Sequence, residues 1–115
     1  MDAQQKQVPL TPAVFHILMA LADGEKHGYL IMKDVEQQTN GKLTMGPGTL
    51  YGSIKRMLAA GLIEESDQRP DPQMDDERRK YYSISSMGKA VLHEESMRLQ
   101  QAVDIARRKQ VLTFI

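Results

Sequence analysis

The residues best suited to chemistry lie between Gly48 and Lys55, where hydroxyl groups, a phenol and a cation share a short segment. Apolar residues recur in this segment at helical spacing and predict a buried helix face made of Leu50, Ile54, Met57 and Leu58. The other surface then carries Thr49, Tyr51, Ser53 and Lys55, whose polar groups can bind phosphate oxygens or base edges. Gly48 lets the helix start approach a sugar-phosphate backbone closely. The segment therefore indicates a nucleic-acid contact.

Two of these side chains also have ordinary structural interpretations, which stay open. Tyr51 can pack its ring on the preceding helix, and Lys55 can be a solvated surface lysine. Arg56 lies about 100 degrees further around the helix and is more often a residue of its flank.

A β-hairpin is expected after this helix, because Leu62 and Ile63 begin a strand and residues 80–85 alternate like its partner. The alternation predicts that Tyr82 and Ile84 point inward and that Tyr81 is partly exposed. A recognition helix followed by such a hairpin, or wing, is typical of a winged helix-turn-helix.

The loop between the two strands is long and charged. Over residues 62–85, seven acids face four bases, so the acidic middle of the loop would repel phosphates. Arg78 and Arg79 adjoin the second strand, and we expect these two to reach an adjacent minor groove or its phosphates.

Tyr29 follows His27 and Gly28 at the predicted start of another helix. Its hydroxyl can lie near a phosphate, which makes it a further DNA-binding candidate, but a tyrosine buried between the first two helices is equally ordinary.

Composition excludes several classes of protein. The chain has no cysteine, and His16, His27 and His93 are too scattered for metal-ligand spacing. It also lacks a nucleophile turn and a glycine-rich phosphate loop, so we expect no catalytic residue, no metal and no cofactor.

With no apolar run near the roughly 20 residues that span a bilayer and no export leader, we expect a cytoplasmic protein without a membrane partner. Fifteen acids balance fifteen bases, which argues against a generic polycation.

The fold class expected from these patterns is mainly α with a small β-hairpin. Proline and hydroxyl residues predict helix starts, and glycines predict ends. The predicted helices cover about residues 11–22, 27–39, 47–61 and 86–112. We expect residues 8–85 to form a winged helix-turn-helix domain and residues 86–115 to form a C-terminal dimerisation helix.

The last helix carries an apolar wedge that a short chain cannot cover by itself. Its members include the expected dimerisation residues Leu92, Leu99, Val103 and Ala106. The first helix is apolar nearly all round, so we expect a homodimer in which the last helix packs on the first and last helices of the other subunit. Glu95 falls in the same wedge, where an arginine such as Arg98 of the other subunit would meet it.

Five pieces of the chain, in order, resemble the PadR family of transcriptional regulators. They lie at residues 10–18, 27–31, 48–51, 58–63 and 79–88, and the resemblance covers roughly residues 8–112. It implies a homodimeric repressor that binds double-stranded DNA, with the final helix as dimer contact, and it fits the class with a single C-terminal helix. The chain departs from the family in a longer, more acidic loop and in having no tryptophan.

Two other roles stay open. A winged helix without DNA binding would be a protein-interaction adaptor, which a net charge of zero permits. A small-molecule effector bound between the first and last helices would make the protein a sensor, and this role is compatible with repression.

Overall fold

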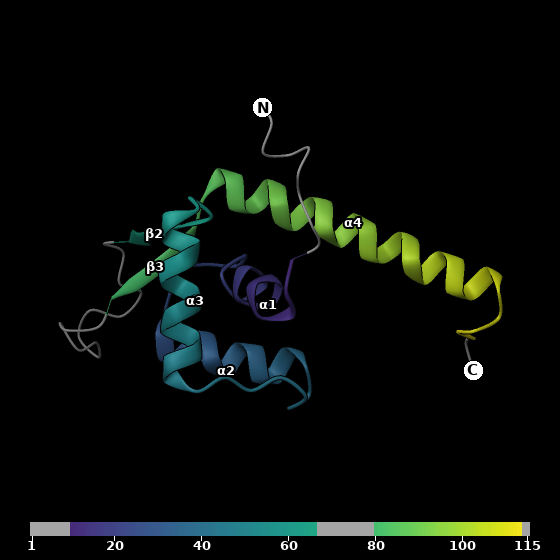
Figure 1. The fold of residues 1–115 in the computed structure, drawn as a ribbon, viewed down its shortest axis with the longest axis horizontal. Coiled ribbons are helices and arrows are strands. Elements are labelled where there is room, and N and C mark those ends of the chain that lie inside the picture. The colour runs from purple at the N-terminus through teal and green to yellow at the C-terminus, as the bar shows by residue number, and fades with distance from the viewer. Residues whose placement is uncertain (1–9, 67–79, 114–115) are drawn as a thin grey trace.

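The computed structural model describes residues 10–66 and 80–113, which form helices around a small sheet (Figure 1). Their order along the chain is α1 (Pro12–Ala20), β1 (Lys26–His27), α2 (Gly28–Gln38), α3 (Pro47–Ala59), β2 (Ile63–Ser66), β3 (Tyr81–Ile84) and α4 (Ser86–Arg108). The predicted fold class, mainly α with a winged helix-turn-helix arrangement, is confirmed.

Local signals in the sequence set the ends of the helices. The Thr11 hydroxyl accepts a hydrogen bond from the amide of Val14, and a proline follows at the first position of α1. Pro47 begins α3 in the same way, and Gly61 leaves that helix with a φ of 80°, in the left-handed region that favours glycine. Ser85 caps α4, so the predicted helix starts are confirmed.

The sheet has three antiparallel strands in the order β1-β3-β2, rather than the two strands expected from the sequence. The predicted hairpin pairs Ile63 with Ile84 and Glu65 with Tyr82. The additional strand pairs Lys26 with Tyr82 on the other edge of β3. Two residues are too few to show an alternating pattern, and the sequence analysis placed His27 at the start of the second helix.

The extra strand explains why Tyr81 is buried, contrary to the predicted partial exposure. Its exposed fraction is 7%, and its ring meets the edge of the His27 ring at a centroid distance of 5.3 Å. The pleat places Tyr81 away from Tyr82, but β1 brings His27 against that second face of β3. Tyr82 is buried as expected, and Ile84 is partly buried.

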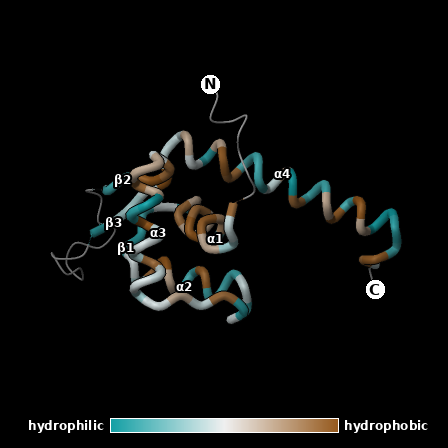
Figure 2. Tube along the Cα trace, viewed as in Figure 1, coloured by the Kyte–Doolittle hydropathy of each residue, from teal (hydrophilic) through white to brown (hydrophobic). Residues whose placement is uncertain are grey.

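Helix α1 lies in the middle of the molecule, with α2, α3 and α4 around it (Figure 1). It is the most continuously hydrophobic segment (Figure 2), and both Ile17 and Leu18 are fully buried. They join one apolar core with residues of α2, α3, β2 and the first half of α4, including Ile31, Leu50, Met57, Ile63 and Leu92. The burial of α1 follows from its nearly unbroken apolar sequence.

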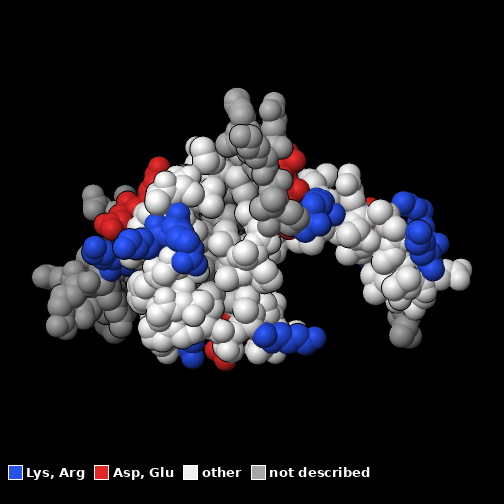
Figure 3. Space-filling view, viewed as in Figure 1, with Lys and Arg blue, Asp and Glu red and all other residues white. Residues whose placement is uncertain are grey.

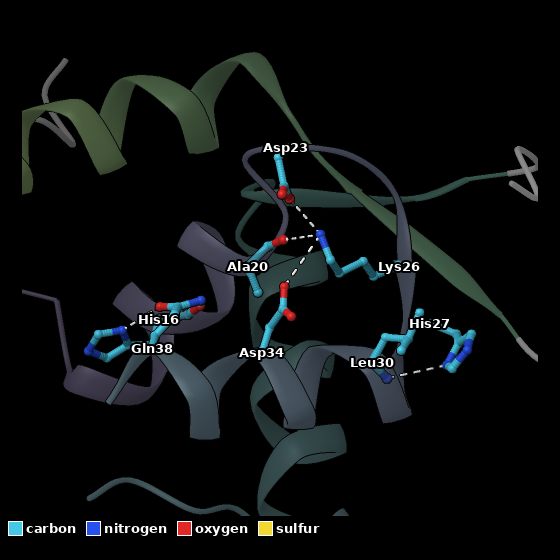
Figure 4. A network of polar contacts seen from close by, with 8 residues as sticks. All are labelled: His16, Ala20, Asp23, Lys26, His27, Leu30, Asp34 and Gln38. Atoms are coloured by element: carbon cyan, nitrogen blue, oxygen red, sulfur yellow. Dashed lines mark hydrogen bonds and ion pairs between the residues drawn. The ribbon is translucent and has the colours of Figure 1, made fainter. Parts of the chain in front are cut away.

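A polar cluster around Lys26 ties the end of α1 to β1 and α2 (Figure 4). The ammonium group donates to the Ala20 carbonyl at 2.7 Å and to the Asp23 carboxylate at 2.5 Å, and lies 3.5 Å from an oxygen of Asp34. The hydrogen bond from Lys26 lowers the pKa of Asp23. The lysine thereby holds the short strand β1 in place, because its charge meets two carboxylates and a helix-terminal carbonyl.

Helix α4 leaves the body of the molecule after its first half (Figure 1). Leu92 packs into the core, whereas Leu99, Val103 and Ile105 further along are exposed. None of the helices in the described part of the chain is long and apolar enough to cross a membrane.

Candidate nucleic-acid interface

Helix α3 presents a polar surface next to a well-buried one. Leu50, Ile54 and Met57 point into the core, and Thr49, Tyr51, Lys55 and Arg56 are exposed. Lys and Arg atoms gather over α3 in the space-filling view, beside Asp and Glu atoms near β2 (Figure 3). The exposed face of α3 therefore joins hydroxyl groups and cations, the groups that bind phosphate oxygens.

The predicted exposure of Ser53 is wrong. Its exposed fraction is 2%, and Arg56 donates a 3.4 Å hydrogen bond to its hydroxyl. Residue 53 stands three positions after Leu50 and four before Met57, so it falls inside the buried stripe of the helix. A serine is small enough to pack there, and the sequence interpretation gave its polarity more weight than its position.

Tyr51 lies across the start of α2 while remaining half exposed. A Cβ atom added at Gly28 would overlap the Tyr51 hydroxyl, so the phenol sits directly on the Gly28 backbone. Burial raises the pKa of Tyr82, and nearby Tyr51 and Glu65 act in the same direction. The two interpretations of Tyr51 are thus compatible: its ring packs on α2, and 48% of its surface still faces solvent.

Gly28 is a residue that sequence analysis did not assign to the interface. The sequence does contain a sign of its role, because a glycine stands between the ring side chains of His27 and Tyr29 at a predicted helix start. Its importance became visible only when α3 was placed against α2, because the contact with Tyr51 joins residues far apart in the chain.

Tyr29 is exposed at the start of α2, as the DNA-binding interpretation requires. Its ring stacks on the ring of His27 at a centroid distance of 6.4 Å, and the Lys33 ammonium lies 5.6 Å from its centroid. His27 itself is buried and caps α2, since Nδ1 accepts a hydrogen bond from the amide of Leu30 (Figure 4). The burial alternative for Tyr29 is therefore wrong.

Gly48 and Thr49 lie exposed in the first turn of α3, beside the cap residue Gly46. A Cβ atom at Gly48 would meet no atom within 4 Å, so the space beside it is open. Gly48, Thr49, Tyr51 and Lys55 are thus all accessible on one helix.

The wing residues Arg78 and Arg79 lie outside the described residues. Lys80, which follows them, is exposed, and its ammonium lies 3.6 Å from the Glu65 carboxylate on β2. This contact brings a positive and a negative charge together beside β2.

The four expected dimerisation residues differ in their surroundings. Leu92 is 8% exposed and belongs to the core of its own subunit. Leu99 and Val103 are each 38% exposed, and Ala106 is partly buried. The apolar surface available to another molecule therefore lies on the second half of α4.

Glu95 meets Arg98 of its own helix, contrary to the expected pairing across two subunits. The guanidinium donates two hydrogen bonds to the carboxylate, from Nε at 2.9 Å and from Nη2 at 2.6 Å. These bonds lower the pKa of Glu95, a residue that is 8% exposed. A spacing of three residues on a helix is enough for the pair to form within one chain.

A shallow cavity of about 280 Å³ opens between α1, β3 and α4. Its lining combines apolar side chains with a lysine, a histidine and a serine, and consists of Met19, Ala22, Ile84, Lys89, Leu92, His93 and Ser96. Among the described residues, no group of three or more histidine, aspartate or glutamate side chains could hold a metal ion.

Sequence comparison decides the family. The profile of the transcriptional regulator PadR-like family matches residues 17–94, which include α2, α3, both strands of the hairpin and the first half of α4. The chain belongs to the PadR-like family. The regulator Rv3488 of Mycobacterium tuberculosis is 33% identical over 86 residues, covering 75% of this PadR-like chain and 74% of that protein.

Another relative is much longer. An uncharacterised protein in a transposon of Streptomyces fradiae is 34% identical over 80 residues, which cover 70% of this chain and 21% of that protein. The PadR-like chain therefore spans about a fifth of the length of that relative.

Solved structures show the same fold. A PadR family transcription regulator from Clostridium difficile superposes with a TM-score of 0.69 at 22% identity, covering 87% of this chain and 99% of that chain. PadR of Bacillus subtilis, solved in complex with operator DNA, superposes with a TM-score of 0.59 at 23% identity. The match covers 70% of this chain and 44% of the Bacillus subtilis chain. The winged-helix arrangement of a PadR-like regulator is thus confirmed.

Proposed function

We propose that this PadR-like protein is a repressor that binds a pseudo-palindromic DNA operator as a homodimer. The observation that carries the proposal is the exposed face of α3, on which Tyr51 is held against Gly28 while Thr49 and Lys55 stay accessible. A helix of this kind can enter the major groove, which admits one α-helix. The operator complex of Bacillus subtilis PadR supports DNA as the partner.

The residues have distinct roles in this proposal. The Tyr51 phenol and the Thr49 hydroxyl donate to phosphates, and Lys55 meets a phosphate or the acceptor edge of a guanine. Gly48 leaves room for the backbone, and Tyr29 extends the contact from α2. Arg78 and Arg79 stay predicted contacts of the wing. Residues 8–85 form the DNA-binding part of the proposal and residues 86–115 the pairing part.

The apolar surface of α4 supports the pairing of two subunits. Leu99 and Val103 are exposed on a helix half that leaves the body of the subunit. A second copy, related by a two-fold axis, covers the same residues on both chains and places two α3 helices on half-sites about one DNA turn apart.

The cavity beneath α4 supports release by an effector. Lys89 offers positive charge and His93 a ring nitrogen beside the apolar surfaces of Met19 and Leu92, which suits an aromatic carboxylate. We expect aromatic acids to raise the unfolding temperature of the protein and to lower its DNA affinity. Replacing Lys89 by Ala should weaken both effects.

The deciding experiment is selection of genomic DNA fragments by the purified protein, followed by mobility shifts of the recovered fragment at increasing salt. A DNA-binding protein loses affinity steeply, with one counterion released for about each phosphate contacted. Recovery of one palindromic fragment supports the proposal. An absence of any fragment and of any salt-dependent shift would favour the adaptor role instead.

A further inference from the structure

Two hydrogen bonds join the start of α4 to the exit of α3, and a third caps α4 through the same serine. The Ser85 hydroxyl donates to the Gly61 carbonyl at 2.6 Å, and the Ser85 amide donates to the Leu62 carbonyl at 3.1 Å. The Gly88 amide donates to the same hydroxyl at 3.0 Å. A single serine therefore joins the end of the helix that faces DNA to the first turn of the helix that carries the pairing surface.

Gly88 allows the two segments to lie this close. It is buried, and an added Cβ atom would overlap the Leu62 carbonyl oxygen and lie 2.8 Å from Cγ1 of Ile84. The carbonyl belongs to the backbone and already accepts the Ser85 amide, so no rotamer change can relieve the overlap. The absence of a side chain at Gly88 thus fixes how near α4 begins to Leu62.

Helix length amplifies a change at this junction. Separating a methyl carbon from the Leu62 oxygen by an ordinary contact distance needs a shift of about 1 Å. Leu92 packs in the core about 6 Å further along the helix and acts as the pivot. A shift of about 1 Å at Gly88 therefore rotates α4 about Leu92 by roughly 10 degrees. The end of α4 at Arg108 lies about 24 Å beyond Leu92 and moves by about 4 Å, close to the rise of one base pair.

We propose that the junction of Ser85 and Gly88 sets the distance between the two recognition helices of the dimer, and therefore the half-site spacing that the protein accepts. The inference rests on the proposed function, because it needs a dimer paired through α4 and DNA bound through α3. In such a dimer the two α4 helices hold each other in place. A rotation at the junction therefore displaces α3 of each subunit relative to the paired α4 helices. Ser85 and Gly88 are positioning residues and need not touch DNA.

The test measures affinity for a series of operators that keep the selected half-sites and change their separation by one base pair at a time. For Gly88→Ala we expect the best separation to shift by about one base pair, with at least about tenfold weaker binding at the parental separation. Ser85→Ala removes the hydrogen bonds of the Ser85 hydroxyl without adding volume. For this variant we expect a flatter profile of affinity against half-site separation. Ser86→Ala is the matched control, since its hydroxyl lies one residue away and is exposed, and it should keep the parental profile.

Separate measurements distinguish the possible failures. Affinity for an isolated half-site should stay within about twofold in all variants, because each α3 still presents its own surface. If folded, dimeric Gly88→Ala and Ser85→Ala keep the parental spacing profile, the inference is wrong and the proposed function stands. If Gly88→Ala does not fold, an unchanged profile of Ser85→Ala alone overturns the inference. A parent protein that binds no fragment overturns the proposed function and this inference together.

Discussion

The hydroxyl of Tyr51 on α3 rests on the backbone of Gly28 at the start of α2, a contact that leaves no room for a side chain at position 28. The glycine therefore lets the phenol lie directly on the backbone of α2, and the phenol is still half exposed to solvent. The contact joins α3 to α2 at a point where Tyr51 and Tyr29 are both exposed to solvent.

Replacing Gly28 by Ala should weaken DNA binding about tenfold by displacing Tyr51, roughly the effect of one lost charge-assisted hydrogen bond. Fluorescence anisotropy titration at fixed salt measures the change. The control is a double-mutant cycle: added to Tyr51→Ala, the Gly28→Ala change should have almost no further effect, because its target is gone. Additive losses would show that Gly28 acts by another route.

Lys55→Ala should lower DNA affinity and reduce the slope of log affinity against log salt by about one, the value for one lost phosphate contact. Tyr51→Phe keeps the ring on Gly28 and should lower affinity without changing that slope. Lys109→Ala removes the same charge near the far end of α4 and serves as the control. Equal slopes in Lys55→Ala and Lys109→Ala would remove Lys55 from the interface.

Ser53→Ala should leave DNA affinity unchanged, because the residue is buried and its hydroxyl accepts a hydrogen bond from Arg56 of the same helix. Ser53→Leu should lower the free energy of unfolding by about 1 to 3 kcal/mol, since extra methylene groups overpack a filled site. Urea denaturation measures the second effect, and anisotropy titration the first. A clear loss of affinity in a fully stable Ser53→Ala protein would restore Ser53 to the DNA surface.

The sequence predicted features that are specified locally and missed those that arise between distant segments. Pro47 and Gly61 restrict their own backbone angles, so the limits of α3 could be read from them. The strand at Lys26 exists only because β3 passes beside it, and the contact of Gly28 with Tyr51 needs α2 and α3 in place. Helical periodicity does predict the burial of Ser53. The prediction of an exposed Ser53 followed the polarity of its side chain instead.

Glu95 should contribute stability that depends on pH. Its pKa in the folded protein is lowered by the hydrogen bonds from Arg98, so the contribution is fully present above the ordinary glutamate pKa of 4.5. It is lost as the pH falls through the lower folded value. We expect Glu95→Gln to be less stable than the parent by about 1 kcal/mol at pH 7, and the two proteins to converge at acidic pH. Thermal unfolding from pH 7 to pH 3 measures this, and a constant difference would exclude the carboxylate as its source.

Leu99→Glu should convert the proposed dimer into folded monomers. Leu99 is 38% exposed on the half of α4 that leaves the body of the subunit, so a charge there disturbs pairing without entering the core. DNA affinity should fall by about 100-fold or more, because each half-site then binds without a linked neighbour. Gln101→Glu adds the same charge on the other side of the helix and should remain dimeric. Sedimentation equilibrium decides between the outcomes: a parent protein that stays monomeric at micromolar concentration rules out pairing through α4 and the palindromic operator that follows from it.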